Sequence, residues 1–522
     1  MRLQSIVQGL DNAVHTSIKQ RPFSLTTSLA TGCECSSWLS SQMLSSMVQL
    51  IQYKATFILT IQKLVCRGFQ FAQNRPYRFE SNEGLYALSL AVSDGAIHDS
   101  AERYPAPNCH PDTRKAVRQI IIDWIHNECS EVPFFWLYGP AGAGKSAILQ
   151  AIAEFMCSSS ESEENFGGSF FFSRGKNGRD QGHFLFSTIA YQLALNVPGL
   201  RQHVNRIMEV NPRLHTKSMA IQLQTLIVDA FQCLSSLPQR SYLIIIDGLD
   251  ECHDKATQQS ILQLLCKAST DHKLPLRFLI GSRPESHIRS IFDHESLNAI
   301  TRRVVLDKKF DPGKDIEVFL QDGFAKICAQ NPILSHGEHS WPGEGIIDLL
   351  VHRSSGQFIY AATVLKFVGA DFCNPKKQLA LILRPDPSAF SDLDHLYTQI
   401  LSVYPSTVDI VRVLGIIVAF TKGDLTPLVI EDILEMEEGE VKLVLRGLSS
   451  LIAFEGDENG EYLTGNIVSN VGRPYFLHAS FGDFLEDSIR SGPFHVDKQV
   501  YKNQGTIRSF AMITQSIASS WR

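Results

Sequence analysis

A glycine-rich stretch that begins at residue 139 constrains the fold of this chain more than any other feature. It reads Gly139, Pro140, Ala141, Gly142, Ala143, Gly144, Lys145, Ser146, a complete G-x-x-x-x-G-K-[ST] phosphate loop. The β-prone run Phe134–Tyr138 precedes it, and good helix formers follow it from Ala147 to Ala153. This order lets successive backbone N–H groups and a helix N-terminus face one phosphate chain. The stretch predicts a nucleotide site; the alternative is a glycine-rich turn that binds nothing.

Definite roles follow for the side chains near this loop. Lys145 is expected to reach the β- and γ-phosphates, and Ser146 to hold Mg²⁺. A later apolar strand ends in Asp247, as a Walker B carboxylate should, which can complete the Mg²⁺ shell opposite Ser146. Asp250 and Glu251 come one short turn further on, so either can orient or deprotonate the attacking water. The alternative is a strand followed by a solvated acidic turn.

Two arginines and one further motif bear on the same site. Arg283 follows an apolar strand, so we expect it at the carboxyl edge of the sheet, where it can sense a γ-phosphate. A surface arginine in a tight turn is the alternative, and Arg174 has a similar claim after its own strand. Thr421–Asp424 mimic the guanine-reading [NT]-K-x-D signature, but they lie far beyond Asp247 and outside the predicted sheet. We interpret them as a coincidental polar turn.

Short apolar strands alternate with helical patterns in the first part of the chain. The predicted strands lie at 134–138, 170–172, 243–246 and 278–281, and the predicted helices at 112–126, 184–195 and 257–267. This alternation indicates an α/β fold, a P-loop NTPase parallel sheet flanked by helices. After about residue 300 the pattern becomes mostly helical. Three short helices at 408–418, 428–434 and 440–448, then strands at 451–454 and 475–477, indicate a winged helix.

The length of 522 residues suggests several domains. We expect an N-terminal region, either a small helical adaptor or a poorly structured leader, followed by nucleotide-binding, helical and winged-helix domains and a tail. The boundaries are 1–95, 96–300, 301–400, 401–500 and 501–522.

Composition limits the partners and the compartment. A net charge of −6 gives no global attraction for nucleic acid, so we expect no nucleic-acid partner. The eleven cysteines form no C-x-x-C pair, which favours reduced thiols in a cytoplasmic protein. The alternative is a metal site of Cys33 and Cys35 with His110 or another distant histidine. The most apolar N-terminal stretch, Met43–Cys66, is interrupted by polar residues and predicts an amphipathic helix, not a membrane span. No secretory signal is expected.

Together these motifs resemble the NACHT-type NTPases of the signal-transduction (STAND) class, specifically the fungal proteins with a nephrocystin-3-like phosphate-loop region. The resemblance covers about residues 94–497 and rests on the phosphate loop, on Asp247–Glu251 and on Ser282–Glu285. Ser355–Ala362 resemble the family's helical segment, and Leu477–Leu485 resemble the end of its winged-helix domain.

The resemblance implies a nucleotide-operated switch, as in fungal NOD-like receptors of innate immunity and heterokaryon incompatibility. ADP would hold the domains closed, and ATP with Mg²⁺, or GTP in place of ATP, would open them to form a homo-oligomer that engages an unknown effector protein. His478 is implied to bond the diphosphate, although a histidine after an apolar strand is otherwise a core or wing residue. Family members usually carry C-terminal repeats, and no such period is visible here, which puts sensing through repeats in doubt.

Two other functions stay open at this point. An ordinary phosphate-loop enzyme, such as a kinase or small GTPase, should show an acceptor pocket or a guanine signature within the first sheet. A nucleotide-binding scaffold without turnover should lose the catalytic residues, yet Lys145, Ser146, Asp247 and Glu251 are all present.

Overall fold

The computed structural model divides into two compact units, residues 1–81 and 82–522. It describes residues 82–503 except 105, 128–131, 159–164, 177, 308–309, 332–333, 335–340, 371–372, 385–390, 404–405, 421–424 and 455–471. Several predicted features therefore lie outside the described residues: the first unit with the predicted helix Met43–Cys66 and the pair Cys33 and Cys35, the tail after residue 503, and Thr421–Asp424.

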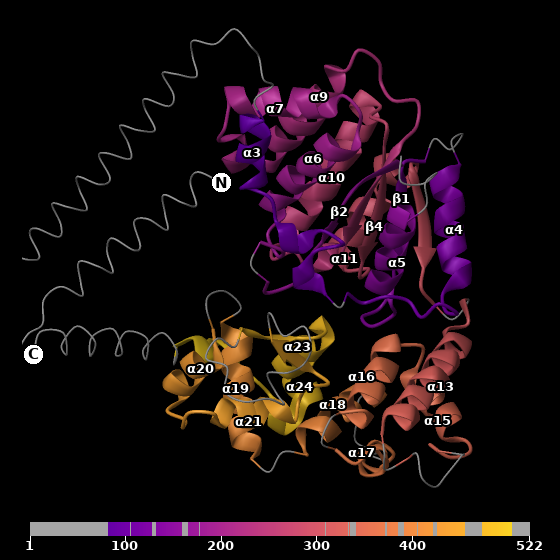
Figure 1. Ribbon diagram of the computed structural model, residues 1–522, viewed down its shortest axis with the longest axis vertical. Helices are drawn as coiled ribbons and strands as arrows, with labels where there is room; N and C mark the ends of the chain where they lie inside the picture. The colour runs from indigo at the N-terminus through magenta and orange to yellow at the C-terminus, as the bar shows by residue number, and fades with distance from the viewer. Residues whose placement is uncertain are drawn as a thin grey trace, which may run out of the picture. The chain divides into compact units, whose positions relative to one another are not determined.

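A five-stranded parallel sheet forms the centre of the described N-terminal part (Figure 1). Its strands are β1 (Phe134–Tyr138), β2 (Phe166–Phe171), β3 (Tyr242–Asp247), β4 (Leu276–Ser282) and β5 (Thr301–Val305), in the order β2-β3-β4-β1-β5. Four of them confirm strands predicted from apolar runs. Because all strands run in one direction, the ends of β1, β3 and β4 lie at the same edge of the sheet, where the predicted site residues follow.

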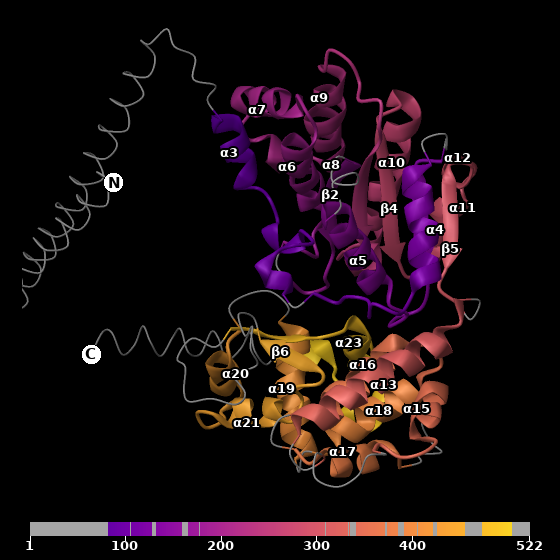
Figure 2. The ribbon, with the colours of Figure 1, turned by 45° about the vertical axis from the view of Figure 1, so that its right-hand side comes forward.

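Helices cover both faces of this sheet, because neighbouring residues of each strand point to opposite sides. On one face Phe135 and Ile245 pack with α4 (Lys115–His126) and α5 (Lys145–Ser158). On the other, Phe134 and Ile244 pack with α6 (Leu185–Asn196) and α10 (Lys255–His272) (Figure 2). The fold is thus the predicted α/β class.

Further elements of this part are α3 (Glu83–Ser89), η1 (Asp94–Ala96), η2 (Ala101–Arg103), η4 (Gly182–Phe184), α7 (Leu200–Val210), η5 (Leu214–Thr216), α8 (Met219–Gln222), η6 (Leu223–Val228), α9 (Asp229–Gln232), η7 (Leu249–Glu251), α11 (Ser286–Asp293) and α12 (Glu295–Asn298).

Two features of this part differ from the sequence pattern. The edge strand β5 lies where the sequence pattern predicted mainly helices. The strand was not predicted because it carries Arg302 and Arg303 and is only half-buried beside β1, so it forms no apolar run. Helix α3 lies before the expected boundary at residue 95, yet its buried Leu85 and Leu88 belong to the same core as α6 and α7.

A second core joins the described residues after the sheet. It contains α13 (Pro312–Gln330), α15 (Ile346–Ser354), α16 (Phe358–Val368), α17 (Pro375–Ile382), α18 (Asp392–Leu401), α19 (Thr407–Ala419), α20 (Pro427–Leu434), α21 (Glu440–Arg446), β6 (Ile452–Phe454), β7 (Pro474–Phe476), α23 (Ala479–Glu486), α24 (Ser488–Ser491) and η9 (Gly492–Phe494). Strands β6 and β7 pair antiparallel after three helices, in the predicted order. The apolar contacts run without a break from α13 to η9, across the expected boundary at residue 400. The name winged helix stays a prediction.

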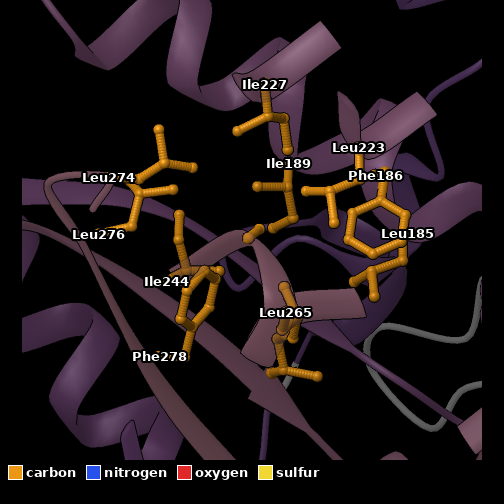
Figure 3. A pocket seen from close by; sticks show the side chains of 12 residues that line it. Leu185, Phe186, Ile189, Leu223, Ile227, Ile244, Leu265, Leu274, Leu276 and Phe278 are labelled. Atoms are coloured by element: carbon orange, nitrogen blue, oxygen red, sulfur yellow. The ribbon is translucent and has the colours of Figure 1, made fainter. Parts of the chain in front are cut away.

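A void of about 10 Å³ lies between the sheet and the helices α6, η6 and α10 (Figure 3). Leu185, Ile227, Ile244 and Phe278 are among its lining residues, all of which are apolar. A buried water needs two to four polar partners, so this void is a packing gap and not a ligand site. Among the described residues no helix is long and apolar enough to cross a bilayer.

Candidate functional site

The phosphate loop connects β1 to α5, as the sequence predicted. Gly142 and Gly144 have φ angles of +73° and +92°, which glycine adopts without the steric cost that a side chain would bring. A Cβ atom on Gly142 would also lie 2.1 Å from Cγ2 of Ile359. The backbone N–H of Ile359, at the start of α16, donates to the Gly142 carbonyl at 3.3 Å. The loop is thus packed directly against the helical part of the chain.

Lys145 is the first residue of α5 and turns back over the loop. Its ammonium group donates to the carbonyl oxygens of Gly139 and Pro140, each at 2.9 Å. Burial lowers the pKa of Lys145, and the nearby carboxylates Asp250 and Asp247 oppose this effect. A cation held beside the loop in this way is placed to bind phosphate oxygens.

Ser146 and Asp247 meet at the predicted metal position. Burial raises the pKa of the Asp247 carboxyl group, and the neighbouring Ser146 side chain opposes this effect. Oδ1 of Asp247 is buried and has no hydrogen-bond partner, although Asp247 is only 3% exposed. Burying an ionised carboxylate oxygen without a hydrogen-bond partner costs free energy unless a cation binds it. A hydroxyl and a carboxylate are ligands that Mg²⁺ accepts, so these residues fit the ion.

Gly281 keeps the space beside this metal position open. A Cβ atom there would come within 2.6 Å of Asp247 Oδ1 and 2.8 Å of the Leu149 side chain. The sequence pattern did not single out Gly281 for this role, because the approach comes from a neighbouring strand.

The structure separates the two acidic residues that the sequence treated as equivalent. Asp250 is buried, and its carboxylate binds Arg283 twice, accepting from the backbone N–H at 2.9 Å and lying 3.1 Å from Nε. Glu251 accepts from the backbone N–H of Arg174 at 3.1 Å. Burial, followed by the charge of Asp250, raises the pKa of Glu251 to about 7. Asp250 therefore positions Arg283, whereas Glu251 has the pKa of a general base working near neutral pH.

Arg283 and Arg174 meet on one carboxylate of the C-terminal part. Asp483, in α23, accepts from Nη1 of Arg283 at 2.5 Å and from Nη1 of Arg174 at 2.8 Å. The Arg283 side chain is 19% exposed and that of Asp483 25%, so their ion pair is largely shielded from water. Sequence reasoning missed Asp483; the only signal was its place within Leu477–Leu485, the stretch that carried the resemblance.

His478 lies at the N-terminus of the same helix, close to the cations Arg283 and Lys145. Its Nδ1 accepts from the backbone N–H of Ser480 at 3.1 Å and lies 2.5 Å from the Ser480 hydroxyl. Burial, then the charges of Arg283 and Lys145, lower the pKa of His478 to about 4. The ring is therefore neutral at pH 7. Because Nδ1 accepts, the proton is assigned to Nε2, which can donate to a phosphate oxygen.

A further contact to the loop comes from Arg114, for which the sequence predicted no role. Nη2 of Arg114 donates to the Ala143 carbonyl at 2.9 Å, and its guanidinium lies 4.8 Å from the ring centre of Phe358. Its backbone N–H donates to Asp315 at 3.0 Å. This arginine therefore ties the loop to both α13 and α16.

The structure thus brings the predicted residues to one edge of the sheet. The ends of β1, β3 and β4 carry the phosphate loop with Ser146, then Asp247, Asp250 and Glu251, and then Arg283. His478 from the C-terminal part lies close to Lys145 and Arg283. His110, the described member of the alternative metal site, instead lies 3.3 Å from Asp322.

Comparison with known protein families finds a match over the part of the chain that carries the phosphate loop. Residues 117–283 match the family model described as nephrocystin 3, N-terminal. No curated protein matches the sequence. One similar solved structure is that of the Aeropyrum pernix ORC1 protein in complex with DNA, with 10% sequence identity and a TM-score of 0.34. That alignment covers 73% of this chain and 93% of the other.

Proposed function

We propose that this protein is a cytoplasmic nucleotide-operated switch of the NACHT type, which binds ATP or ADP with Mg²⁺ and hydrolyses the triphosphate slowly. In this proposal the domains follow one another in the order expected from the sequence, except that α3 joins the nucleotide-binding domain, and the winged helix lies after residue 400. The triphosphate form assembles into a homo-oligomer and engages an effector protein, as the resemblance to fungal NOD-like receptors implies.

One observation carries the proposal: Arg283 is shared between the nucleotide site and the C-terminal part. It follows β4 beside the phosphate loop, yet its guanidinium binds Asp483 of α23. A γ-phosphate offers the same arginine an anion of greater charge. Binding of a triphosphate would therefore compete with the contact that holds α23, which links the nucleotide state to the arrangement of the chain.

The roles of the residues follow from their contacts. The loop N–H groups and Lys145 bind the phosphates, and Ser146 with Asp247 holds the metal, which when bound supplies charge compensation for the phosphate oxygens. Glu251 takes a proton from the attacking water at neutral pH, while Asp250 keeps Arg283 in place. His478 donates from Nε2 to the diphosphate that remains, and so favours the closed form after hydrolysis.

The contacts that a γ-phosphate adds can supply the free energy that such a switch needs. Converting a 1:99 ratio of open to closed forms into 99:1 needs about 5.5 kcal/mol of differential binding. Charge-assisted hydrogen bonds contribute about 1.5–3 kcal/mol each, so a few contacts made only by the γ-phosphate suffice.

Purified full-length protein tests the proposal. Bound nucleotide is identified after denaturation, and the mass in solution is then compared with ADP and with a non-hydrolysable ATP analogue, each with Mg²⁺. A larger particle with the ATP analogue alone supports the switch. Fast multiple turnover without a change in mass instead identifies an ordinary phosphate-loop enzyme, and nucleotide binding with neither turnover nor assembly identifies a scaffold. The Lys145→Ala variant serves as the control without a phosphate site.

A further inference from the structure

An open groove lies away from the phosphate loop, between the segment after η1 and the C-terminal half of α5. Its volume is about 720 Å³, and its described lining residues include His98, Asp99, Asn108, Glu154 and Cys157. None of the nucleotide-site residues lines it. The proposed switch therefore leaves this groove without a role.

A thiol and an imidazole meet in this groove. Cys157 is exposed, and its Sγ lies 3.4 Å from Nε2 of His98. Helix α5 supplies Cys157 near its end, while His98 comes from the segment that precedes η2.

His98 is held in a fixed orientation by the buried residue Ser169 on β2. The Ser169 hydroxyl oxygen accepts from the backbone N–H of His98 at 3.0 Å and lies 3.2 Å from ring Nδ1. Phe166 packs edge-on against the ring at 5.2 Å between centroids, and the Gln150 side chain donates to the His98 carbonyl at 3.0 Å. With its proton on Nδ1 and directed to Ser169, the ring presents the Nε2 lone pair to the thiol.

The charges around the pair favour a neutral imidazole and a cationic ligand. Burial lowers the pKa of His98, and Arg103 acts in the same direction while Asp99 and Glu154 oppose it. Arg103 is itself buried and bonded to Gln150 at 2.7 Å. Asp99 and Glu154 line the groove, whereas none of its described lining residues is a lysine or an arginine. A ligand with amino groups is therefore attracted, and one with carboxylates is repelled.

We propose that Cys157 and His98 form a thiol-exchange site that takes a small cationic disulfide. The Cys157 thiol passes its proton to Nε2 of His98 as its sulfur attacks one sulfur of the ligand. The ligand's S–S bond breaks, and the departing thiolate takes up the proton from His98. Cys157 is thereby oxidised to a mixed disulfide, and half of the ligand is reduced and released as a thiol. The reaction needs no other oxidant.

A second exposed cysteine provides an internal control in the same molecule. Cys233 is also exposed, and among the described residues its thiol makes no hydrogen bond to a histidine. Full-length protein is incubated with cystamine at pH 7, and the mixed disulfide on each cysteine-containing peptide is followed with time by mass spectrometry. General-base assistance contributes about 10²- to 10⁴-fold in enzymes, so Cys157 should react at least about tenfold faster than Cys233.

Variants and a second probe test each part of the proposal. His98→Gln should bring the rate at Cys157 down to that of Cys233 and leave Cys233 unchanged, while His126→Gln, at the exposed end of α4, should alter neither. The unchanged rate at Cys233 and an unchanged Tm show that His98→Gln has kept its fold. Equal rates at the two cysteines, or a rate at Cys157 that survives His98→Gln, would overturn the site. The anionic glutathione disulfide should favour Cys157 over Cys233 less than cystamine does; an equal preference would overturn the choice of a cationic ligand.

Discussion

Replacing Asp483 by asparagine should loosen the contact between α23 and the nucleotide site. The change keeps the shape of the side chain and removes one negative charge, on which Arg283 and Arg174 converge. Because the substitution lies outside the phosphate loop, binding of ADP can be measured in the same variant. The perturbation thus separates the arrangement of the chain from the presence of a site.

The solvent exposure of the two ion pairs determines how much free energy the substitution costs. The Arg283 pair is largely shielded, and a charge-assisted hydrogen bond of this kind contributes about 1.5–3 kcal/mol. The Arg174 side chain is 46% exposed, so solvent reduces its pair to about 0.2–1 kcal/mol. Together they amount to about 2–4 kcal/mol, of which asparagine retains part through its amide oxygen. A loss of about 2 kcal/mol shifts the closed-to-open ratio about thirtyfold, since 1.4 kcal/mol corresponds to a factor of ten.

Hydrogen exchange and small-angle scattering measure this shift. In Asp483→Asn with ADP, protection of the amides in α23 should fall by about the same factor, and the radius of gyration should rise if the open form becomes populated. Glu486→Gln removes an equal charge from the same helix at an exposed position, 3.7 Å from Lys498, and should leave both quantities unchanged. If Asp483→Asn matches Glu486→Gln in both measurements, the two arginines do not hold α23 and the reasoning fails.

Four further outcomes are expected. Lys145→Met should weaken nucleotide binding at least about tenfold by equilibrium titration, because it removes charge-assisted bonds of about 1.5–3 kcal/mol each; unchanged affinity would exclude the loop as the site. The hydrolysis rate should rise with pH through about 7, as the Glu251 carboxyl group loses its proton, and Glu251→Gln should lower it about 10²- to 10⁴-fold without this pH limb; a pH-independent wild-type rate would argue against a general base. Gly142→Ala should lower the free energy of unfolding in urea by more than Gly439→Ala does. Both positions have a positive φ, at which a side chain costs about 1–3 kcal/mol, but only at Gly142 would the new Cβ atom collide with Ile359. Equal losses in the two variants would mean that the contact between the loop and Ile359 is loose. Finally, the ATP analogue with a chelator in place of Mg²⁺ should leave the mass in solution as it is with ADP, and assembly without the metal would contradict the proposed metal role.

The sequence was sufficient for the centre of the fold because its signals there are local. Phe134–Tyr138 and the end of β3 are continuous apolar runs followed by turn residues, so both the strands and the polar groups after them are visible without a structure. The edge strand β5 gives no such signal, since Thr301–Val305 is half polar and has a neighbour on one side only.

What the sequence could not supply are contacts between distant segments. Asp250 and Glu251 are adjacent acids in the chain, and only the approach of Arg283 to Asp250 gives them different contacts. Asp483 is separated from Arg283 by 200 residues, and no periodicity connects the two. The roles of Arg114 and Ile359 at the loop depend in the same way on how α13 and α16 pack.

The charges of the site explain why a metal and a triphosphate should act together. The described side chains place Lys145, Arg174 and Arg283 against Asp247, Asp250, Glu251 and Asp483. Arg103 adds a further cation near Asp247, yet burial raises the pKa of both Asp247 and Glu251, so the ionised forms of these carboxyl groups are disfavoured. A divalent ion at Asp247 would stabilise its ionised form, but it offers Arg283 no new partner. A triphosphate does offer one, yet without the ion it adds negative charge beside a buried carboxylate. Only the two together compensate Asp247 and draw Arg283 away from Asp483, so the contact with α23 should respond to the metal-bound triphosphate and to neither component alone.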